Sequence, residues 1–252
     1  MNGVNGSHAA PTNGLGQAYT DQVIKSIGPK TDARLKEVMI SLIQHVHDFA
    51  REVDLTFDEW MAGVEMINWA GQRSTSTRNE GQLLCDVIGL ESLVDDITNR
   101  KAAEAVDSAT ASAVLGPFWR HDTPMREFGS TITFDTPSDG QVAYIHGVIA
   151  DAQTKKPIPN ALVDVWQAST NGLYEQQDEN QVEHNLRGKF LTNDKGEYAF
   201  YSLRPVPYPV PVDGAAGKMM KLLDRNLFRP AHIHYLVTAD GYKPLTTQIF
   251  DS

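Results

Sequence analysis

Apolar residues recur at helical spacing through the amino-terminal part of the chain, from Thr20 to about Val106. Recurrence every three or four positions places apolar side chains on one face and predicts amphipathic helices. Thr31 can cap the first long helix, and Thr56 with Glu59 three residues later forms a capping-box pattern for another. The pattern predicts four or five helices that pack on each other and on another part of the chain. Its apolar positions are Leu35, Val38, Met39, Leu42, Ile43, Val46, Phe49, Trp60, Val64, Ile67, Leu83, Leu84, Val87, Ile88, Leu93, Val94 and Ile97.

A different pattern begins near residues 116–119, the segment Gly-Pro-Phe-Trp. From there Pro, Gly and β-branched residues become frequent and helical periodicity disappears, which favours strands and turns. Short strands divided by turns at Lys155–Asn160 and at residues 193–196 predict an antiparallel β-sandwich. The expected strands are Val142–Ala150, Ala161–Gln167, Lys189–Leu191, Glu197–Tyr201, His232–Thr238 and Thr246–Phe250.

These patterns divide the chain into three parts. Residues 1–19 are rich in Gly, Asn, Ala and Ser and are expected to be a disordered lead. Residues 20–110 form a helical domain, and residues 111–252 form the β-sandwich, so the expected fold class is α+β.

Composition and charge narrow the functional classes. The formal net charge is −10, and no cluster of Lys and Arg is present, which disfavours nucleic acid as a partner. No uninterrupted apolar stretch approaches the roughly 18 residues that a membrane span requires. Because Cys85 is the sole cysteine, no intrachain disulfide can form, and we expect a reducing, cytoplasmic location.

Two histidines are separated by one residue in an expected strand. A period of two places His232 and His234 on the same face, where two imidazoles can share a metal ion. Ordinary half-buried strand histidines would give the same spacing, so spacing alone leaves both interpretations open. His45 and His47 lie two apart on an expected helix and therefore point in different directions.

Two tyrosines are candidates for the remaining ligands. Tyr208 lies in a segment with four prolines, which restrict the backbone and reduce the entropy lost on fixing one side chain. Tyr174 follows the expected strand Ala161–Gln167 in a loop, where functional groups often lie. A structural or partner-binding role for the proline-rich loop, and a tyrosine packed on the sheet surface, remain alternatives on spacing alone.

Six ordered motifs resemble those of the intradiol ring-cleaving dioxygenases. The helical segment also looks like the amino-terminal dimerisation domain of this family, so the resemblance covers most of the chain after residue 20. The motifs are Leu-Gly-Pro-Phe-Trp at 115–119, Ala-Leu-Val-Asp-Val-Trp-Gln-Ala at 161–168, Gly-Leu-Tyr at 172–174, Tyr-Pro-Val-Pro-Val-Asp-Gly at 208–214, Arg-Pro-Ala-His-Ile-His at 229–234 and Leu-Thr-Thr-Gln-Ile at 245–249.

The resemblance implies one non-haem Fe(III) per chain, a homodimer through the amino-terminal helices, and an aromatic diol or triol with O2 as substrates. Ionising one free tyrosine at pH 7 costs about 4 kcal/mol, and a trivalent cation can offset that cost. The resemblance further implies that Tyr208 is displaced by substrate and takes up one of its protons. Carried over position by position, the ferric ligands are Tyr174, Tyr208, His232 and His234, with Arg229 and Gln248 beside the substrate.

Two motif variants are most similar to hydroxyquinol 1,2-dioxygenases, which implies cleavage of hydroxyquinol to maleylacetate; with catechol the product would be cis,cis-muconate. By the same resemblance Asp86 could accept a hydrogen bond from a third ring hydroxyl. The residues implied to line the ring pocket are Leu83, Asp86, Val114, Leu115 and Gly116.

The sequence departs from the family pattern at the carboxyl end. Family members usually continue past the Thr-Thr-Gln-Ile segment, so the sandwich is expected to be shortened and an inactive truncated relative is one alternative. A second alternative is a non-catalytic β-sandwich that binds a ligand or a partner.

Overall fold

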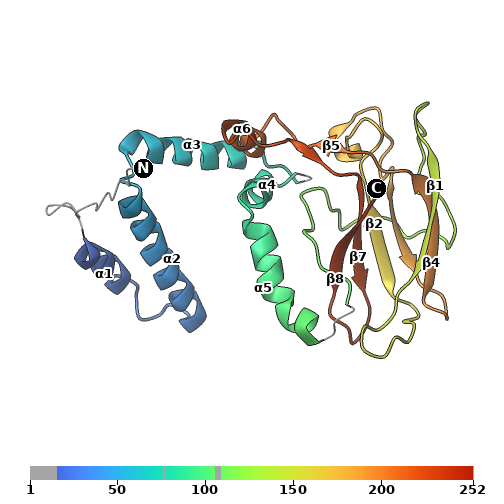
Figure 1. Cartoon of the computed structure of the whole chain (residues 1–252), viewed down its shortest axis with the longest axis horizontal. Helices are drawn as coiled ribbons and strands as arrows, with labels where there is room; N and C mark the ends of the chain where they lie inside the picture. The colour runs from blue at the N-terminus through green and yellow to red at the C-terminus, as the bar shows by residue number, and fades with distance from the viewer. Residues whose placement is uncertain (1–15, 77, 106–108, 252) are drawn as a thin grey trace, which may run out of the picture. The chain divides into compact units, whose positions relative to one another are not determined.

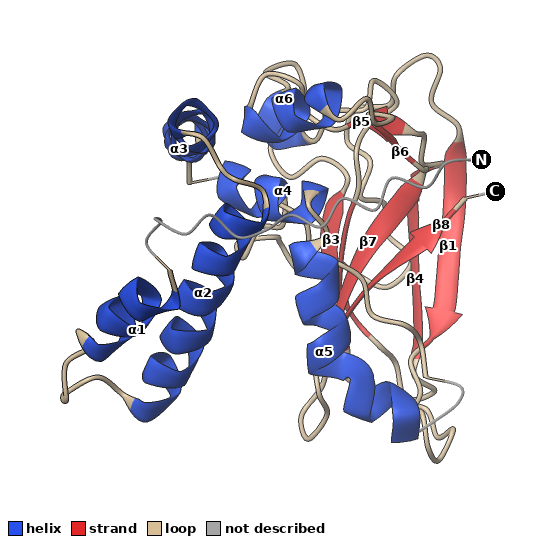
Figure 2. Cartoon of the chain, turned by 60° about the vertical axis from the view of Figure 1, so that its left-hand side comes forward, coloured by secondary structure: helices blue, strands red, loops and turns tan. Residues whose placement is uncertain are grey.

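The computed structural model describes residues 16–251 except residues 77 and 106–108. It divides into two compact units, Met1–Val64 and Glu65–Ser252, each of which is described by itself. Figure 1 gives the order of the elements, and Figure 2 separates helices from strands. Most of the expected lead lies outside the described residues, and a helix begins at Gln17. The domain limits expected from the sequence stay a prediction.

The first unit is helical, with α1 (Gln17–Lys25), α2 (Ala33–Glu52) and the start of α3 (Phe57–Arg73). The expectation that Thr31 caps α2 is wrong: the cap is Asp32, whose carboxylate accepts a hydrogen bond from the backbone N–H of Leu35. Either residue type can fill this position, and the chain turns one residue later than expected.

The capping box expected before α3 is confirmed. The backbone N–H of Thr56 donates to Glu59 at 2.9 Å, and the backbone N–H of Glu59 donates to the Thr56 hydroxyl at 3.3 Å. Two N–H groups that a helix start leaves without partners are thereby satisfied. The helix begins where the sequence indicates.

In the second unit three helices accompany the sheets: α4 (Glu80–Val87), α5 (Leu90–Ala105) and α6 (Ala215–Leu222). The first two continue the expected helical series, whereas α6 was not expected. Among the described residues, no helix is long and apolar enough to cross a membrane.

The strands are antiparallel throughout the described sheets. A four-stranded sheet has the order β3-β2-β7-β8, and β1 pairs with β4 in a second sheet. A third pairing joins β5 to β6, two strands of two residues each. The bounds are β1 (Val142–Val148), β2 (Leu162–Trp166), β3 (Arg187–Leu191), β4 (Glu197–Leu203), β5 (Tyr208–Pro209), β6 (Phe228–Arg229), β7 (His232–Thr238) and β8 (Leu245–Phe250).

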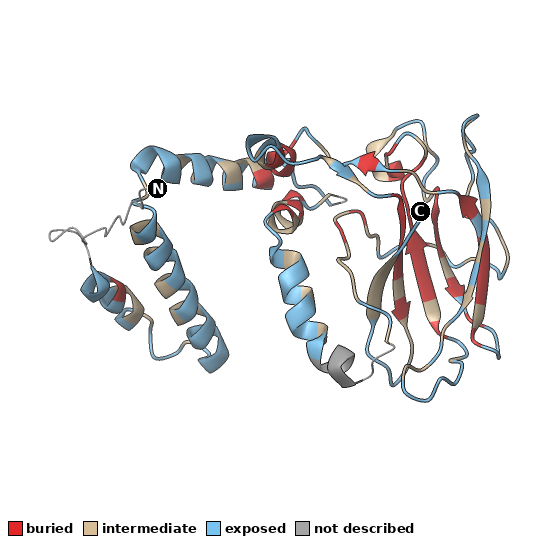
Figure 3. Ribbon diagram, in the orientation of Figure 1, coloured by how far each residue is buried: buried red, intermediate tan, exposed pale blue. Residues whose placement is uncertain are grey.

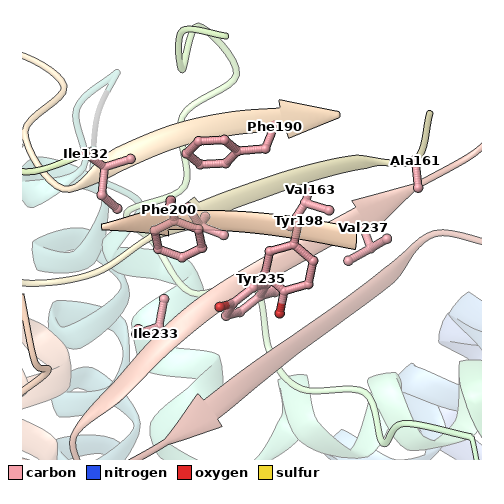
Figure 4. Close-up of a cluster of buried hydrophobic side chains, with 10 residues drawn as sticks. Ile132, Ala161, Val163, Phe190, Tyr198, Phe200, Ile233, Tyr235 and Val237 are labelled. Atoms are coloured by element: carbon pink, nitrogen blue, oxygen red, sulfur yellow. The ribbon is translucent and has the colours of Figure 1, made fainter. Parts of the chain in front are cut away.

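A hydrophobic core lies between the β1-β4 sheet and the four-stranded sheet (Figure 4). Phe200 of β4, Phe190 of β3 and Tyr235 of β7 are each no more than 2% exposed, and the rings of Phe190 and Phe200 stack at 5.1 Å. Two sheets that bury their inner faces against one core form a sandwich. The expected order of a helical part followed by an antiparallel sandwich is confirmed.

Candidate metal centre

His232 and His234 project from the same face of β7, as the period of two predicts. Pairing with β2 on one side and β8 on the other holds β7 in the middle of the sheet. The two histidines are 1% and 2% exposed, and their Nε2 atoms lie 3.1 Å apart. Two buried imidazole nitrogens therefore meet at one point.

Tyr208 reaches the same point from the loop that follows β4. Tyr208 is the first residue of β5 and pairs with Arg229 of β6, 21 residues later in the chain. This strand pairing fixes the backbone of Tyr208. Its hydroxyl lies 3.2 Å from Nε2 of His232 and 2.9 Å from the hydroxyl of Tyr174. Both tyrosines are buried, at 4% and 1% exposure.

The loop that carries Tyr174 packs tightly against Tyr208. Gly172 adopts φ +78°, and a Cβ at this position would lie 2.8 Å from Cβ of Tyr208. A side chain here would both strain the backbone and push Tyr208 away. The glycine therefore permits the two tyrosine hydroxyls to approach.

The four donor atoms form a chain of contacts of 2.9, 3.2 and 3.1 Å. Oxygen and nitrogen donors bound to one ion at about 2.1 Å lie about 3 Å apart when adjacent. The structure thus brings together all four side chains that the resemblance implied. Their spacing and donor types fit a single metal ion.

Burial sets the protonation states in this cluster. It lowers the pKa of His232 to about 4 and that of His234 well below its usual value, so both imidazoles are neutral at pH 7. Nδ1 of His232 lies 2.7 Å from the carbonyl oxygen of Pro230, which requires a proton on Nδ1 and leaves the Nε2 lone pair toward the cluster.

Burial raises the pKa of both tyrosines, well above the usual value for Tyr174. Without a cation both phenols are protonated. Ionising two buried phenols at pH 7 is costly, and a trivalent ion offsets that cost more fully than a divalent ion does. The donor set therefore fits a ferric ion.

Aromatic rings surround the cluster. Trp166 is 1% exposed and stacks on His234 with ring centroids 4.8 Å apart, and Phe118 stacks on Tyr174 at 4.6 Å. Neither residue was a candidate from the sequence, although the strand alternation places Trp166 on the face of β2 away from the sandwich core. These rings exclude water from the donor atoms.

Arg229 and Gln248, which the resemblance implied to lie beside the substrate, border the cluster. Nη2 of Arg229 donates to Oε1 of Gln248 at 3.4 Å, and Nε2 of Gln248 lies 3.3 Å from Nδ1 of His234. Gln248 pairs with His234 in the β7–β8 register. A cation and an amide therefore border the same centre.

The five residues implied for the ring pocket divide into two groups, one at Val114 to Gly116 and one on α4. Gly116 lies against His234, because a Cβ added there would be 3.2 Å from its Cε1 atom, and the carbonyl of Val114 accepts from Gln248 at 3.1 Å. Leu115 packs on the aromatic cluster around Tyr174.

Leu83 and Asp86 lie on α4. Leu83 packs against Val210, two residues after Tyr208. The negative charge of Asp86 contributes to raising the pKa of Tyr208, which places this carboxylate within electrostatic range of the cluster. A cavity of about 430 Å³ adjoins Leu115 and Gly116 and includes Arg78 and Gln82 in its lining.

Two buried charges and one half-buried charge lie behind Tyr174, and none of the three was a candidate from the sequence. Nε of Arg187 donates to Oε2 of Glu175 at 2.7 Å, and Nη1 of Arg120 donates to Oε1 of Glu175 at 3.0 Å. Arg187 lies 5.8 Å from the ring centroid of Tyr174. Glu175, directly after Tyr174, was the one signal in the sequence for this group. Its partners Arg120 and Arg187 come from other segments of the chain, so the sequence could not reveal the pairing.

Another group of possible ligands lies elsewhere on the second unit. One ligand atom each from Asp122, Glu183 and His184 lies within 4.8 Å of the others. Arg120 donates to both carboxylates of this group, at 2.8 and 3.2 Å. Since a guanidinium already neutralises these exposed acids, the buried tyrosine and histidine cluster is the stronger metal candidate.

Comparison with known proteins agrees with this geometry. A family model described as Dioxygenase matches residues 114–252, and one described as Catechol dioxygenase N terminus matches residues 32–106. An intradiol ring-cleavage dioxygenase of Aspergillus niger is 51% identical over 93% of this chain and 74% of its own length.

A catechol 1,2-dioxygenase of Candida albicans is 45% identical over 94% of this chain and 78% of its own. The solved structure of a hydroxyquinol 1,2-dioxygenase from Pseudomonas putida matches with a TM-score of 0.80 at 37% identity, covering 94% of this chain and 80% of that one.

Proposed function

The chain belongs to the intradiol ring-cleaving dioxygenases, an enzyme family that uses non-haem iron, and on this premise we propose that its buried tyrosine and histidine cluster holds one ferric ion for the cleavage of hydroxyquinol or catechol. Family membership favours this function over a non-catalytic binding module. The observation that carries the proposal is the meeting of two phenol oxygens and two imidazole nitrogens at contacts of 2.9 to 3.2 Å.

A ferric ion held by Tyr174, Tyr208, His232 and His234 would supply Lewis acidity and a redox-active centre for the reaction of a bound diol with dioxygen. Tyr174, His232 and His234 would stay as its ligands throughout. Both oxygen atoms of O2 enter the product, and the bond between the two hydroxylated carbons breaks.

Tyr208 is the proposed proton acceptor. Its hydroxyl is the atom of the cluster that contacts both another tyrosine and a histidine. A substrate that binds through two adjacent hydroxyls has to lose both protons, and the phenolate oxygen of Tyr208 can accept one of them on leaving the metal. The second proton requires a separate acceptor.

Arg229 and Gln248 are proposed to bind the ring. The Arg229 guanidinium would stabilise negative charge that develops on the ring, and the Gln248 amide would orient it by a hydrogen bond. The buried rings of Trp166 and Phe118 keep water away, which strengthens both interactions.

The pocket residues on α4 and at Val114 to Gly116 are proposed to determine which hydroxylated ring is the preferred substrate. Asp86 could accept a hydrogen bond from a third hydroxyl, which hydroxyquinol has and catechol lacks. A site that hydrogen-bonds such a group discriminates strongly against a ring without it.

We further propose a homodimer through the amino-terminal helices. Along α2 a row of apolar side chains is 42 to 53% exposed: Leu35, Val38, Leu42, Val46 and Phe49. Figure 3 colours much of this helix as exposed. A continuous apolar row on one helix face is typical of a surface that another chain covers.

Oxygen consumption tests the activity. The iron-loaded protein is mixed in turn with catechol, hydroxyquinol and protocatechuate, and uptake of one O2 per ring is expected with at least one of the first two. No uptake with any of the three, in protein that contains one iron per chain, contradicts the proposed function.

A further inference from the structure

A fully buried carboxylate lies outside the residues to which the proposed function gives a role. Glu80, at the start of α4, is 0% exposed. Its Oε2 accepts from Nε and Nη2 of Arg78 at 3.0 and 2.7 Å, and its Oε1 accepts from the backbone N–H of Ala216 at 3.1 Å. Both oxygens are therefore engaged, one by a cation and the other by the first turn of α6.

The α6 helix depends on this carboxylate for its start. Its N-cap residue is Gly214, which has no side chain to cap the helix. A carboxylate at a helix N-terminus satisfies free N–H groups and interacts favourably with the helix dipole. A Cβ on Gly214 would overlap the Glu80 carboxylate, so the glycine leaves the space that Glu80 occupies.

Arg78 extends the same connection to the loop before α6. Its Nη1 and Nη2 donate to the two carboxylate oxygens of Asp213 at 3.0 and 2.9 Å, a two-point pairing that fixes direction as well as distance. We call Arg78, Glu80 and Asp213 the α4–α6 clamp.

The clamp joins two parts of the proposed active site. On one side is α4, which carries Leu83 and Asp86 of the proposed ring pocket. On the other is the loop from Tyr208 to Gly214, where Val210 packs against Leu83 in a shared apolar cluster. The pocket helix and the tyrosine loop are thus held as one body by buried charge and apolar contact.

We infer that Glu80 is a positioning residue that fixes the backbone of the Tyr208 loop on the pocket helix, so that the Tyr208 side chain can leave and rejoin the metal without movement of the loop. This inference rests on the proposed function. It goes beyond that function by giving a role to a carboxylate that touches neither metal ligand nor substrate.

Glu80→Gln is the test variant. Glutamine keeps one oxygen for Ala216 but turns its amide donors toward the Arg78 guanidinium, so the clamp loosens. Asp213 still pairs with Arg78, so no unpaired buried charge remains. The control is Glu183→Gln, which removes a carboxylate that is 72% exposed and pairs with Arg120 on the same unit.

Three quantities are measured on each protein: the ferric affinity of metal-free protein, the tyrosinate-to-iron absorption with and without anaerobic catechol, and kcat with KM. In Glu80→Gln we expect iron to bind about tenfold more weakly, which corresponds to the loss of one charge-assisted hydrogen bond. The absorption of the resting protein should shift, whereas the catechol complex, in which Tyr208 has left the metal, should absorb as in the wild type.

A kcat about tenfold lower with KM changed by less than about twofold is also expected, since the return of Tyr208 belongs to turnover more than to binding. The inference would be overturned if Glu80→Gln had the same spectra, iron affinity and kinetics as Glu183→Gln and differed only by a lower melting temperature. If Glu80→Gln does not fold, Asp213→Asn must give a smaller shift of the same sign.

The outcomes separate the inference from its premise. Wild-type protein without iron or visible absorption overturns the proposed function together with the inference. Coloured, active wild type with an unaffected Glu80→Gln variant overturns the inference alone.

Discussion

At the scale of single residues, the proposed centre could be predicted from the sequence only in part. The period of two in a strand was enough to place His232 and His234 on one face. Tyr208 was beyond such reasoning, because its position depends on the pairing of β5 with β6, and neither two-residue strand has a recognisable pattern. Loop position made both tyrosines candidates, the resemblance decided in favour of ligation, and the structure brings their hydroxyls within 2.9 Å.

Gly172→Ala is expected to disturb the proposed centre through Tyr208. The new Cβ would lie 2.8 Å from Cβ of Tyr208, so the tyrosine has to move. We expect iron affinity to fall at least about tenfold, because a ligand displaced by a few tenths of an ångström loses bond strength. Competition with a ferric chelator measures this affinity.

Gly241→Ala is a matched control for the backbone effect. Gly241 has φ +81° against +78° for Gly172, but nothing lies within 4 Å of an added Cβ. Both substitutions cost about 1–2 kcal/mol of stability from the left-handed backbone. Equal iron affinities in the two variants would contradict the role given to Gly172.

At the scale of elements, long periodic segments were predicted well and short ones were missed. The strand His232–Thr238 was predicted with its observed ends, and α3 begins at its capping box. The helix α6 was missed because its residues follow a proline-rich loop and its N-cap is a glycine, so its start depends on Glu80 from a distant segment. Local signals cannot reveal a cap that comes from 136 residues away.

A pH-dependent stability is expected from β2. Burial raises the pKa of Asp164 to about 6, above the usual 3.8 of an unfolded chain. The folded protein favours the protonated form of Asp164. The stability that this carboxyl contributes to the fold is therefore fully present below pH 3.8 and is lost as pH rises through about 6. A shift of about two units corresponds to at most about 3 kcal/mol.

Asp164→Asn removes this titration while keeping an oxygen that can accept from Nε1 of Trp119. Relative to wild type, the variant should gain stability between pH 4 and pH 7, measured by urea unfolding. Asp122→Asn gives the opposite sign, since a hydrogen bond from Arg120 lowers the pKa of Asp122 to about 2. A stability difference for Asp164→Asn that does not change with pH would contradict this account.

At the scale of the whole molecule, the hydrophobic pattern predicted a helical part and an antiparallel sandwich, but not the division into compact units. The division falls at Val64, inside α3. This helix is continuous, and its two ends belong to different units. A helical pattern along the sequence cannot distinguish the ends of such a helix.

Self-association is expected to depend on the exposed row of α2. Leu42 is 51% exposed in the middle of that row. In Leu42→Glu a charge would have to be buried in the apolar interface, which is strongly unfavourable. Sedimentation should find a dimer for the wild type and a monomer for the variant.

Ser41→Glu places the same charge one position earlier on the same helix, away from the row, and is expected to leave the dimer intact. A dimer in both variants, or a wild-type monomer at micromolar concentration, would contradict the proposed interface.

The central claim is that two phenols and two imidazoles hold one ferric ion, and the iron content and visible absorption of wild type and Tyr174→Phe test it most directly. We expect one iron per chain and a strong visible tyrosinate-to-iron band in the wild type, with most of the iron and the band lost in Tyr174→Phe. A colourless wild-type protein that binds one zinc per chain, or a Tyr174→Phe variant with unchanged iron and absorption, would contradict it.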